Sequence, residues 1–228
     1  MDHIEIEATT LFLIGPLPVT NTIFSAWITM ALLVGASYLG TRRLKTVPSG
    51  FQNTIEYIVE ALLGVCETSA GPRGRRFLPI VGTAFLFILF SNWMGLLPGY
   101  GDTPWLRSAN SDLNITAAMA LVVFVLAQGW AIKSAGPFGY LKEFVYPNPL
   151  HLLSELSRPL SLALRLFGNI FAGEVLLVVM AGLIPFAIPV VFFGLEVFVG
   201  IVQALIFSML TLVFLTIATA HQGGETHH

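Results

Sequence analysis

Long apolar stretches, separated by charged or Pro- and Gly-rich segments, recur along this chain of 228 residues. A helix needs about 17–25 mostly apolar residues to cross the ~30 Å hydrocarbon core of a bilayer. Five stretches meet that requirement: 23–39, 77–97, 113–132, 150–184 and 190–220. The pattern therefore predicts an all-α integral membrane protein in which 1–228 form a single membrane domain.

The segment 52–68 is less apolar and has a different pattern. Glu56, Glu60 and Glu67 follow spacings of four and seven, which places them on one helical face. Another face carries the apolar residues Ile55, Ile58, Val59 and Leu62. Such an amphipathic helix is suited to the membrane interface or to packing against other helices, and we expect an interfacial helix here.

The distribution of Lys and Arg predicts the orientation, because positively charged loops stay on the cytoplasmic side. The segment 42–76 holds six of these residues, the loop 98–112 one and the loop 133–149 two. One consistent arrangement places the N-terminus outside, 42–76 and the C-terminus in the cytoplasm, and the turn 185–189 outside.

The last two predicted helices are longer than a bilayer requires. The segment 190–220 would reach ~46 Å at 1.5 Å per residue, and fitting it into the hydrocarbon core needs a tilt of roughly 50°. That tilt exceeds the usual range of ~0–40°. We therefore expect the last two helices to form a long, strongly tilted or bent hairpin.

Composition agrees with a membrane protein. Hydrophobic residues make up 55% of the chain, charged residues 11%, and the mean hydropathy is +0.81. An ordinary soluble domain has ~25% charged residues. The net charge of −2 gives no reason to expect a nucleic-acid partner, and the single Cys66 excludes a disulfide framework within the chain and a Cys-based metal site. We expect neither a cofactor nor a metal.

Polar residues inside the last two helices are the candidates for function. Arg165, Glu174 and Glu196 are charged, and Asn169 and Gln203 are polar. A charge at membrane depth costs ~2.5–3.5 kcal/mol on insertion scales, so residues of this kind usually serve a function. Structural interpretations are open as well. The arginine could extend to a membrane interface, and the two amides could form hydrogen bonds between helices, which typically contribute ~0.6 kcal/mol.

The spacing of these residues separates them into two surfaces. Arg158, Ser161, Arg165 and Asn169 lie within about 40° of one azimuth of a helix. Glu174 lies half a turn away from Arg165, so the two should serve different surfaces. Arg158 is equally well explained by a position at the inner membrane interface.

The chemistry of these side chains suggests a proton path. The guanidinium of Arg165 stays charged in proteins and cannot carry the proton itself. It can attract an ionised carboxylate of a partner and repel unaccompanied protons. Glu174 and Glu196 can change their charge. A fixed cation between groups that exchange protons is what a gated proton path needs.

Several segments resemble subunit a of the F-type ATP synthases. The segment 158–174 reads RPLSLALRLFGNIFAGE and resembles the signature of that family. Further similarity lies in 203–207 (QALIF), 91–98 (SNWMGLLP) and 112–116 (DLNIT), so the resemblance covers nearly the whole chain.

The resemblance implies a mechanism. Subunit a sits beside a rotating ring of c subunits, each with one membrane carboxylate, and provides two half-channels that open on opposite sides. Arg165 would face the ring and separate the half-channels. The resemblance places further residues along the outer half-channel and the arginine's surroundings: Asn169, Glu174, Glu196 and Gln203. It places Ser161 and Arg158 near the arginine and the inner path.

The chain departs from the family pattern at three positions. Some members have His where this chain has Glu196, so two carboxylates are expected along the entry path. His151 stands where others carry an acid, and an interfacial or loop position explains it better than a relay does. Gly95 also stands where some relatives have an acid.

The resemblance also implies partners: the c-subunit ring, the b-subunit peripheral stalk and the rest of the F1Fo complex. The location implied is a bacterial inner membrane or a related thylakoid-type membrane, and the ion is H⁺, with Na⁺ left open. The chain has no Gly-rich loop with a Lys for nucleotides, so we expect an ion-conducting subunit of the two-sector ATPase that is not itself catalytic.

Two other functions compete with this interpretation. Buried charges and broken helices also suit a stand-alone secondary ion transporter, although the chain is small and has no internal repeat. An intramembrane enzyme or quinone-binding subunit would need a metal-ligand cluster or a nucleophile–base pair at depth, which the sequence does not offer.

Overall fold

The computed structural model describes residues 9–15, 17–42, 44, 50–97, 107–145, 149–183 and 188–220. Five helical segments in this part are long and apolar enough to cross a membrane, which confirms the predicted number: 21–41, 52–95, 113–134, 155–180 and 190–219. The second segment contains both the predicted interfacial helix 52–68 and most of the predicted span 77–97. The elements are β1 (Thr10–Ile14), β2 (Leu17–Thr20), α1 (Asn21–Thr41), α2 (Phe51–Ala70), η1 (Gly71–Arg73), α3 (Gly74–Gly95), η2 (Ala109–Ser111), α4 (Leu113–Val145), α5 (Pro149–Leu183) and α6 (Ile188–Ala220).

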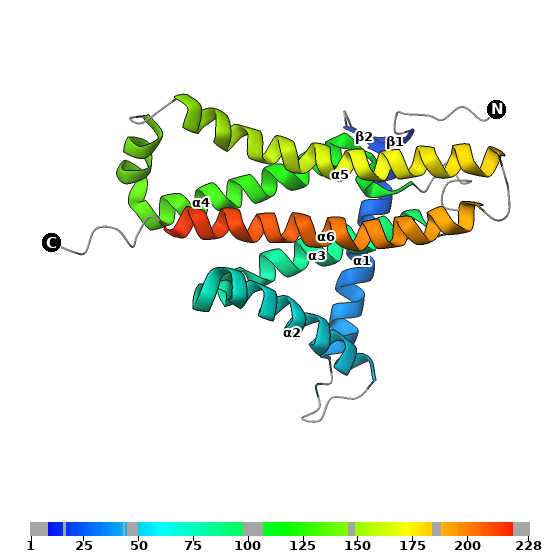
Figure 1. Cartoon of the computed structure of the whole chain (residues 1–228), viewed down its shortest axis with the longest axis horizontal. Helices are drawn as coiled ribbons and strands as arrows, with labels where there is room; N and C mark the ends of the chain where they lie inside the picture. Colours follow the sequence, from blue (N-terminus) through cyan, green and yellow to red (C-terminus); the bar gives the residue numbers. More distant parts are fainter. Residues whose placement is uncertain are drawn as a thin grey trace.

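The helices α3, α4, α5 and α6 lie side by side, and α1 crosses their direction steeply (Figure 1). The helices α5 and α6, of 35 and 33 residues, run antiparallel, as the long-hairpin prediction requires. Their inclination to a bilayer stays a prediction. Residues 185–187 of the predicted turn and 98–106 of the predicted loop lie outside the described residues, whereas Ile188 and Pro189 belong to α6.

The first part of the chain differs from the all-α expectation. β1 and β2 form an antiparallel hairpin, and Gly15 takes a φ of 62° at its turn. The flanking residues are β-branched or apolar, which suits a short strand pair, and glycine adopts this backbone conformation without strain. The hairpin leads directly into α1, where the Thr20 hydroxyl accepts a hydrogen bond from the Ile23 amide at 3.4 Å.

The amphipathic helix predicted at 52–68 is α2, and it packs against α3. Leu62 and Cys66 on α2 are buried in that contact. The turn between the helices is tight, because a Cβ at Gly74 would fall on the backbone carbonyl of Cys66. The alternative of packing against other helices is therefore confirmed, and a position along the membrane interface stays a prediction.

The loop expected at 133–149 is wrong over most of its length, because α4 continues to Val145. Gly136 interrupts the helix with φ 73° and ψ 158°, a conformation that other residues rarely adopt. The chain changes direction there and then resumes helical hydrogen bonding. The Pro and Gly residues that predicted a loop produce a kink between two helical pieces.

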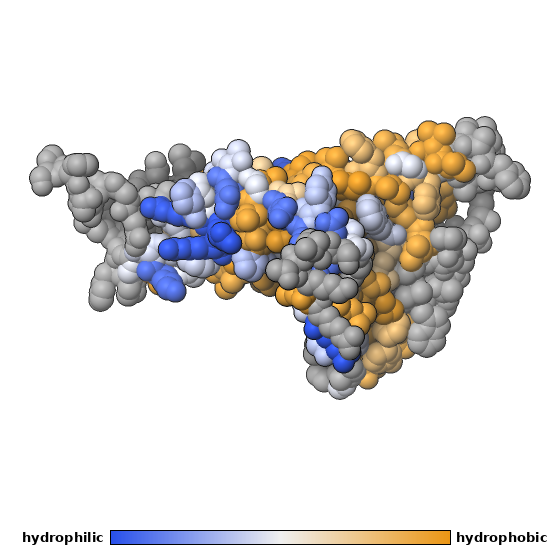
Figure 2. Space-filling model, turned by 90° about the horizontal axis from the view of Figure 1, so that it is seen from below, coloured by the Kyte–Doolittle hydropathy of each residue, from blue (hydrophilic) through white to orange (hydrophobic). Residues whose placement is uncertain are grey.

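The core between the helices is formed by apolar side chains from α2 to α6. Its most buried members include Ile88 on α3, Ala120 on α4, Leu166 on α5 and Ala204 on α6. Many large apolar side chains are exposed as well, and on the face shown in Figure 2 hydrophilic residues gather mainly in one half. Apolar residues both inside and outside are typical of a protein whose solvent is lipid.

Candidate functional site

Arg165 lies on the exposed face of α5, although its neighbour Leu166 is 1% exposed in the core. The Arg165 side chain has no hydrogen-bond or ion-pair partner among the described residues. Ser161, one turn earlier, is exposed too, and Asn169, one turn later, is half-buried. Of the predicted polar stripe, Ser161 and Arg165 thus lie on an open surface of α5, and Asn169 lies at the edge of that surface.

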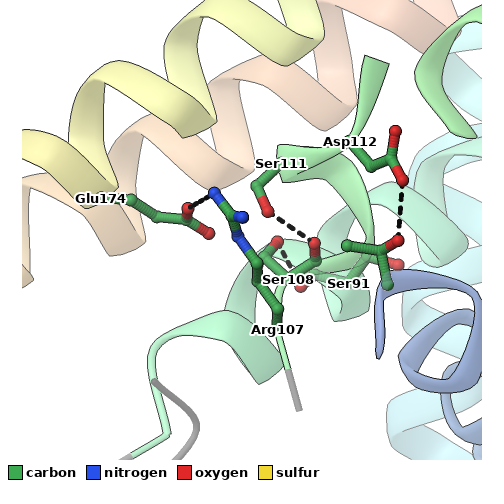
Figure 3. Close-up of polar contacts among 7 residues, drawn as sticks. Ser91, Arg107, Ser108, Ser111, Asp112 and Glu174 are labelled. Atoms are coloured by element: carbon green, nitrogen blue, oxygen red, sulfur yellow. Dashed lines mark hydrogen bonds and ion pairs between the residues drawn. The ribbon is translucent and has the colours of Figure 1, made fainter. Parts of the chain in front are cut away.

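Glu174 forms an ion pair with Arg107, which precedes η2. The Arg107 guanidinium lies 3.2 Å from Oε2 of Glu174, and the two side chains are 17% and 30% exposed (Figure 3). The backbone amide of Arg107 donates a hydrogen bond to Oγ of Ser25 on α1 at 3.3 Å. The separation of Arg165 and Glu174 onto different surfaces therefore holds, and the partner of Glu174 is another arginine.

The segment that carries Arg107 is anchored by buried polar side chains (Figure 3). The Ser108 hydroxyl donates a hydrogen bond to the backbone carbonyl of Ser91 on α3 at 3.4 Å. Asp112 accepts a hydrogen bond from the Thr22 hydroxyl on α1 at 2.8 Å and another from the backbone amide of Asn114 at 2.8 Å. These contacts fix η2 against α1 and α3 at the start of α4, so Arg107 is held in place.

Glu196 on α6 fits against a notch in α5. A Cβ at Gly173 would fall on Oε1 of Glu196, so a larger residue at this position would displace the carboxylate from where it lies. The other oxygen, Oε2, is buried and has no hydrogen-bond partner among the described residues. Gly173 directly precedes Glu174, so the Glu196 carboxylate meets α5 one residue away from Glu174. The structure thus brings Glu174, Glu196 and Arg107 together.

A polar layer lies beside this cluster, between α3, η2 and α6. The Asn92 amide donates a hydrogen bond to the Gly200 carbonyl at 3.3 Å, and the Asn110 amide donates to Oδ1 of Asn92 at 2.7 Å. Gly200 allows the close approach, since a Cβ there would lie 3.2 Å from Cβ of Asn92. Gln203, three residues further along α6, is 9% exposed.

Arg158 belongs to a second polar cluster, on the N-terminal side of Arg165. Its guanidinium lies 2.5 Å from Oε1 of Glu155 and 5.4 Å from the ring centroid of Phe214 on α6. The Gln128 amide on α4 donates a hydrogen bond to Oε2 of Glu155 at 3.1 Å. His151 lies in the first turn of α5, but its side chain is outside the description.

Sequence reasoning missed two members of these clusters. Arg107 had no local signal, because its partner is 67 residues away in the chain. Glu155 had a local signal in the sequence, since it lies three residues before Arg158 on a helix, a spacing that brings opposite charges together.

The comparison with known sequences decides the family. The model of the family described as "ATP synthase A chain" matches residues 23–216. The chain belongs to this family. A relative from Moorella thermoacetica named ATP synthase subunit a is 36% identical over 215 residues, which cover 92% of this chain and 96% of the relative. A second, from Gloeobacter violaceus, is 36% identical over 234 residues, or 99% and 94% of the two chains.

Membership of the ATP synthase A chain family supports the coarser predictions. The chain is an integral membrane protein of the kind that forms part of an ATP synthase, which fits the five apolar helical segments in the described part of the chain. The comparisons give no support to the alternative of a stand-alone secondary transporter.

Proposed function

We propose that this chain is the proton-translocating stator subunit of an F-type ATP synthase, with two half-channels that meet a c-ring on either side of Arg165. The observation that carries the proposal is the position of this arginine. It lies exposed and unpaired among the described residues of α5, between the Glu155–Arg158 cluster and the Glu174–Glu196–Arg107 cluster. A permanent cation between two polar clusters fits a barrier between two aqueous paths.

In this mechanism a proton enters past Glu196 and Glu174 and neutralises a carboxylate of the ring. Rotation carries the neutral site through lipid, and the proton leaves on the inner side past Ser161 and Arg158. Arg165 attracts the ring carboxylate when it is ionised and repels protons that would cross directly. One charge crossing 100 mV yields ~2.3 kcal/mol, so several protons must be combined per ATP, which favours a rotor with repeated steps.

The remaining assignments follow from this function. Asn169 and Gln203 would line the arginine's surroundings, and the role of His151 stays open. We propose contact with the c-ring and with the b-subunit stalk, no catalysis by the chain itself, and H⁺ as the ion. We also propose a bacterial inner membrane or a thylakoid-type membrane, with the N-terminus outside and the C-terminus in the cytoplasm. The hairpin α5–α6 would lie strongly tilted, and α2 would lie near the interface.

Cross-linking in the intact complex tests the position of the ring. A benzophenone maleimide on Ala172→Cys, which is exposed on nearly the same azimuth as Arg165, should form an adduct with the small ring subunit. The same probe on Val34→Cys, 69% exposed on α1, should not. Both variants carry Cys66→Ser to remove the native thiol. Ring adducts from Val34 and none from Ala172 would contradict the proposed face.

Gly173→Ala is expected to lower proton translocation about tenfold or more, because the added methyl group displaces the Glu196 carboxylate. ATP-driven acidification of inverted vesicles, normalised to assembled complex, measures the effect. Gly182→Ala on the same helix is the matched control, since a Cβ there meets nothing within 4 Å. Equal pumping by both variants would show that the notch has no role.

A further inference from the structure

We infer that Arg107 is the counter-charge of the entry site, and that it lets the Glu174–Glu196 carboxylate pair exchange one proton at a time. The inference rests on the proposed function and deepens it. Arg107 is a positioning residue in this scheme, because it acts on the carboxylates and not on the ring.

The placement of Arg107 argues against an incidental surface contact. Its side chain is only 17% exposed, and its guanidinium lies 3.2 Å from Glu174. The segment that follows it is buried, with Ser108 at 3% and Asn110 at 0% exposure. A mobile loop arginine would have none of this anchoring, and most exposed ion pairs contribute little.

The charge of the cluster explains why an arginine is needed. Two neighbouring carboxylates at membrane depth cannot both ionise without a counter-ion, since like charges at close range disfavour the second ionisation. With Arg107 present, the cluster is neutral when the pair holds one proton and carries one negative charge after release. Without Arg107, the same release would leave two negative charges.

The groups that face the Glu174–Glu196 pair from each neighbouring element support this charge balance. Arg107 approaches from the segment before η2, and Glu196 approaches from α6. Asp112, the other nearby acid, is turned away and accepts hydrogen bonds from Thr22 and Asn114. Ser111, which lies near Arg107 and Glu174, is uncharged (Figure 3). In the described part of the chain the count is therefore one cation and two carboxylates.

The count predicts opposite effects for the two single variants and compensation in the double variant. Arg107→Gln makes the site hold its proton too firmly, so passive proton flux falls about tenfold and its pH profile moves to higher pH by about one unit. Glu174→Gln leaves Arg107 opposite Glu196 alone, so the profile moves to lower pH. The double variant restores the two charge states of the natural site and should regain most of the flux and the original profile.

The measurement uses membrane vesicles that contain the complex, stripped of the soluble F1 sector, with flux recorded against external pH and normalised to the amount of chain. Arg107→Lys keeps the charge and should stay near the natural profile. Arg75→Gln, an exposed arginine at the start of α3, is the matched control and should change nothing. It separates a local effect from a general loss of positive charge.

The outcomes separate the inference from the function on which it rests. Two results would show that Arg107 has only a structural role, provided that the natural complex conducts protons. The single variants would keep the natural pH profile, or the double variant would have no more proton flux than the less active single variant. If Arg107→Gln does not assemble, Arg107→Lys and the double variant still decide the question through their profiles. Absence of proton flux through the natural stripped complex would instead overturn the proposed function itself.

Discussion

Arg165→Ala is expected to abolish proton-driven ATP synthesis while the complex still assembles. The side chain is exposed and unpaired among the described residues, so its removal leaves no buried group without a partner and should cost little stability. Its loss would remove the fixed charge that attracts the ionised ring carboxylate and separates the half-channels. Loss of one such preorganised charge typically reduces a rate by about 100-fold or more.

The measurement is ATP synthesis in vesicles energised by a substrate or by an imposed pH gradient, with the assembled complex quantified in parallel. Leu164→Ala is the matched control, because this neighbour is also exposed, at 49%, but carries no charge. Its synthesis rate should stay near the natural one. Full coupled synthesis in Arg165→Ala would refute the barrier role and favour an arginine that merely snorkels to an interface.

The sequence predicts the helices of this fold well, because lipid imposes one dominant requirement. Each span must be long and apolar, and hydropathy alone locates such segments. The sequence did not predict the smaller features, and the reason is physical. The β1–β2 hairpin is too short for a strong periodic signal, and the continuation of α4 past Gly136 depends on one backbone conformation that composition does not reveal.

Part of the candidate site could likewise be predicted from the sequence, and part could not. A charge at membrane depth is costly, so the sequence alone singled out Arg165, Glu174 and Glu196. What it could not give is the pairing of side chains that are distant in the chain. The ion pair of Arg107 with Glu174 exists because the segment before η2 folds onto α1 and α3, and no local spacing encodes that contact.

Glu196→Gln is expected to lower proton translocation about 100-fold, the loss typical when a positioned proton-transfer group is removed. Gln keeps the volume and most of the hydrogen-bonding capacity of Glu, but its amide cannot bind and release a proton near neutral pH. The buried oxygen Oε2, without a partner among the described residues, is the reason to single out this side chain. A buried oxygen that no neighbouring group satisfies costs free energy, and a proton or water that arrives there would relieve that cost.

Two comparisons decide between a relay and a structural role for Glu196. Glu67→Gln, on an exposed carboxylate of α2, should leave ATP-driven pumping and passive flux unchanged. Glu196→His should retain substantial flux, because imidazole also exchanges protons and some relatives are expected to carry it at this position. A structural role predicts the reverse order, since Gln matches the shape of Glu against Gly173 and His does not. Natural flux in Glu196→Gln would therefore remove this residue from the path and leave Glu174 as the acid on the outer side.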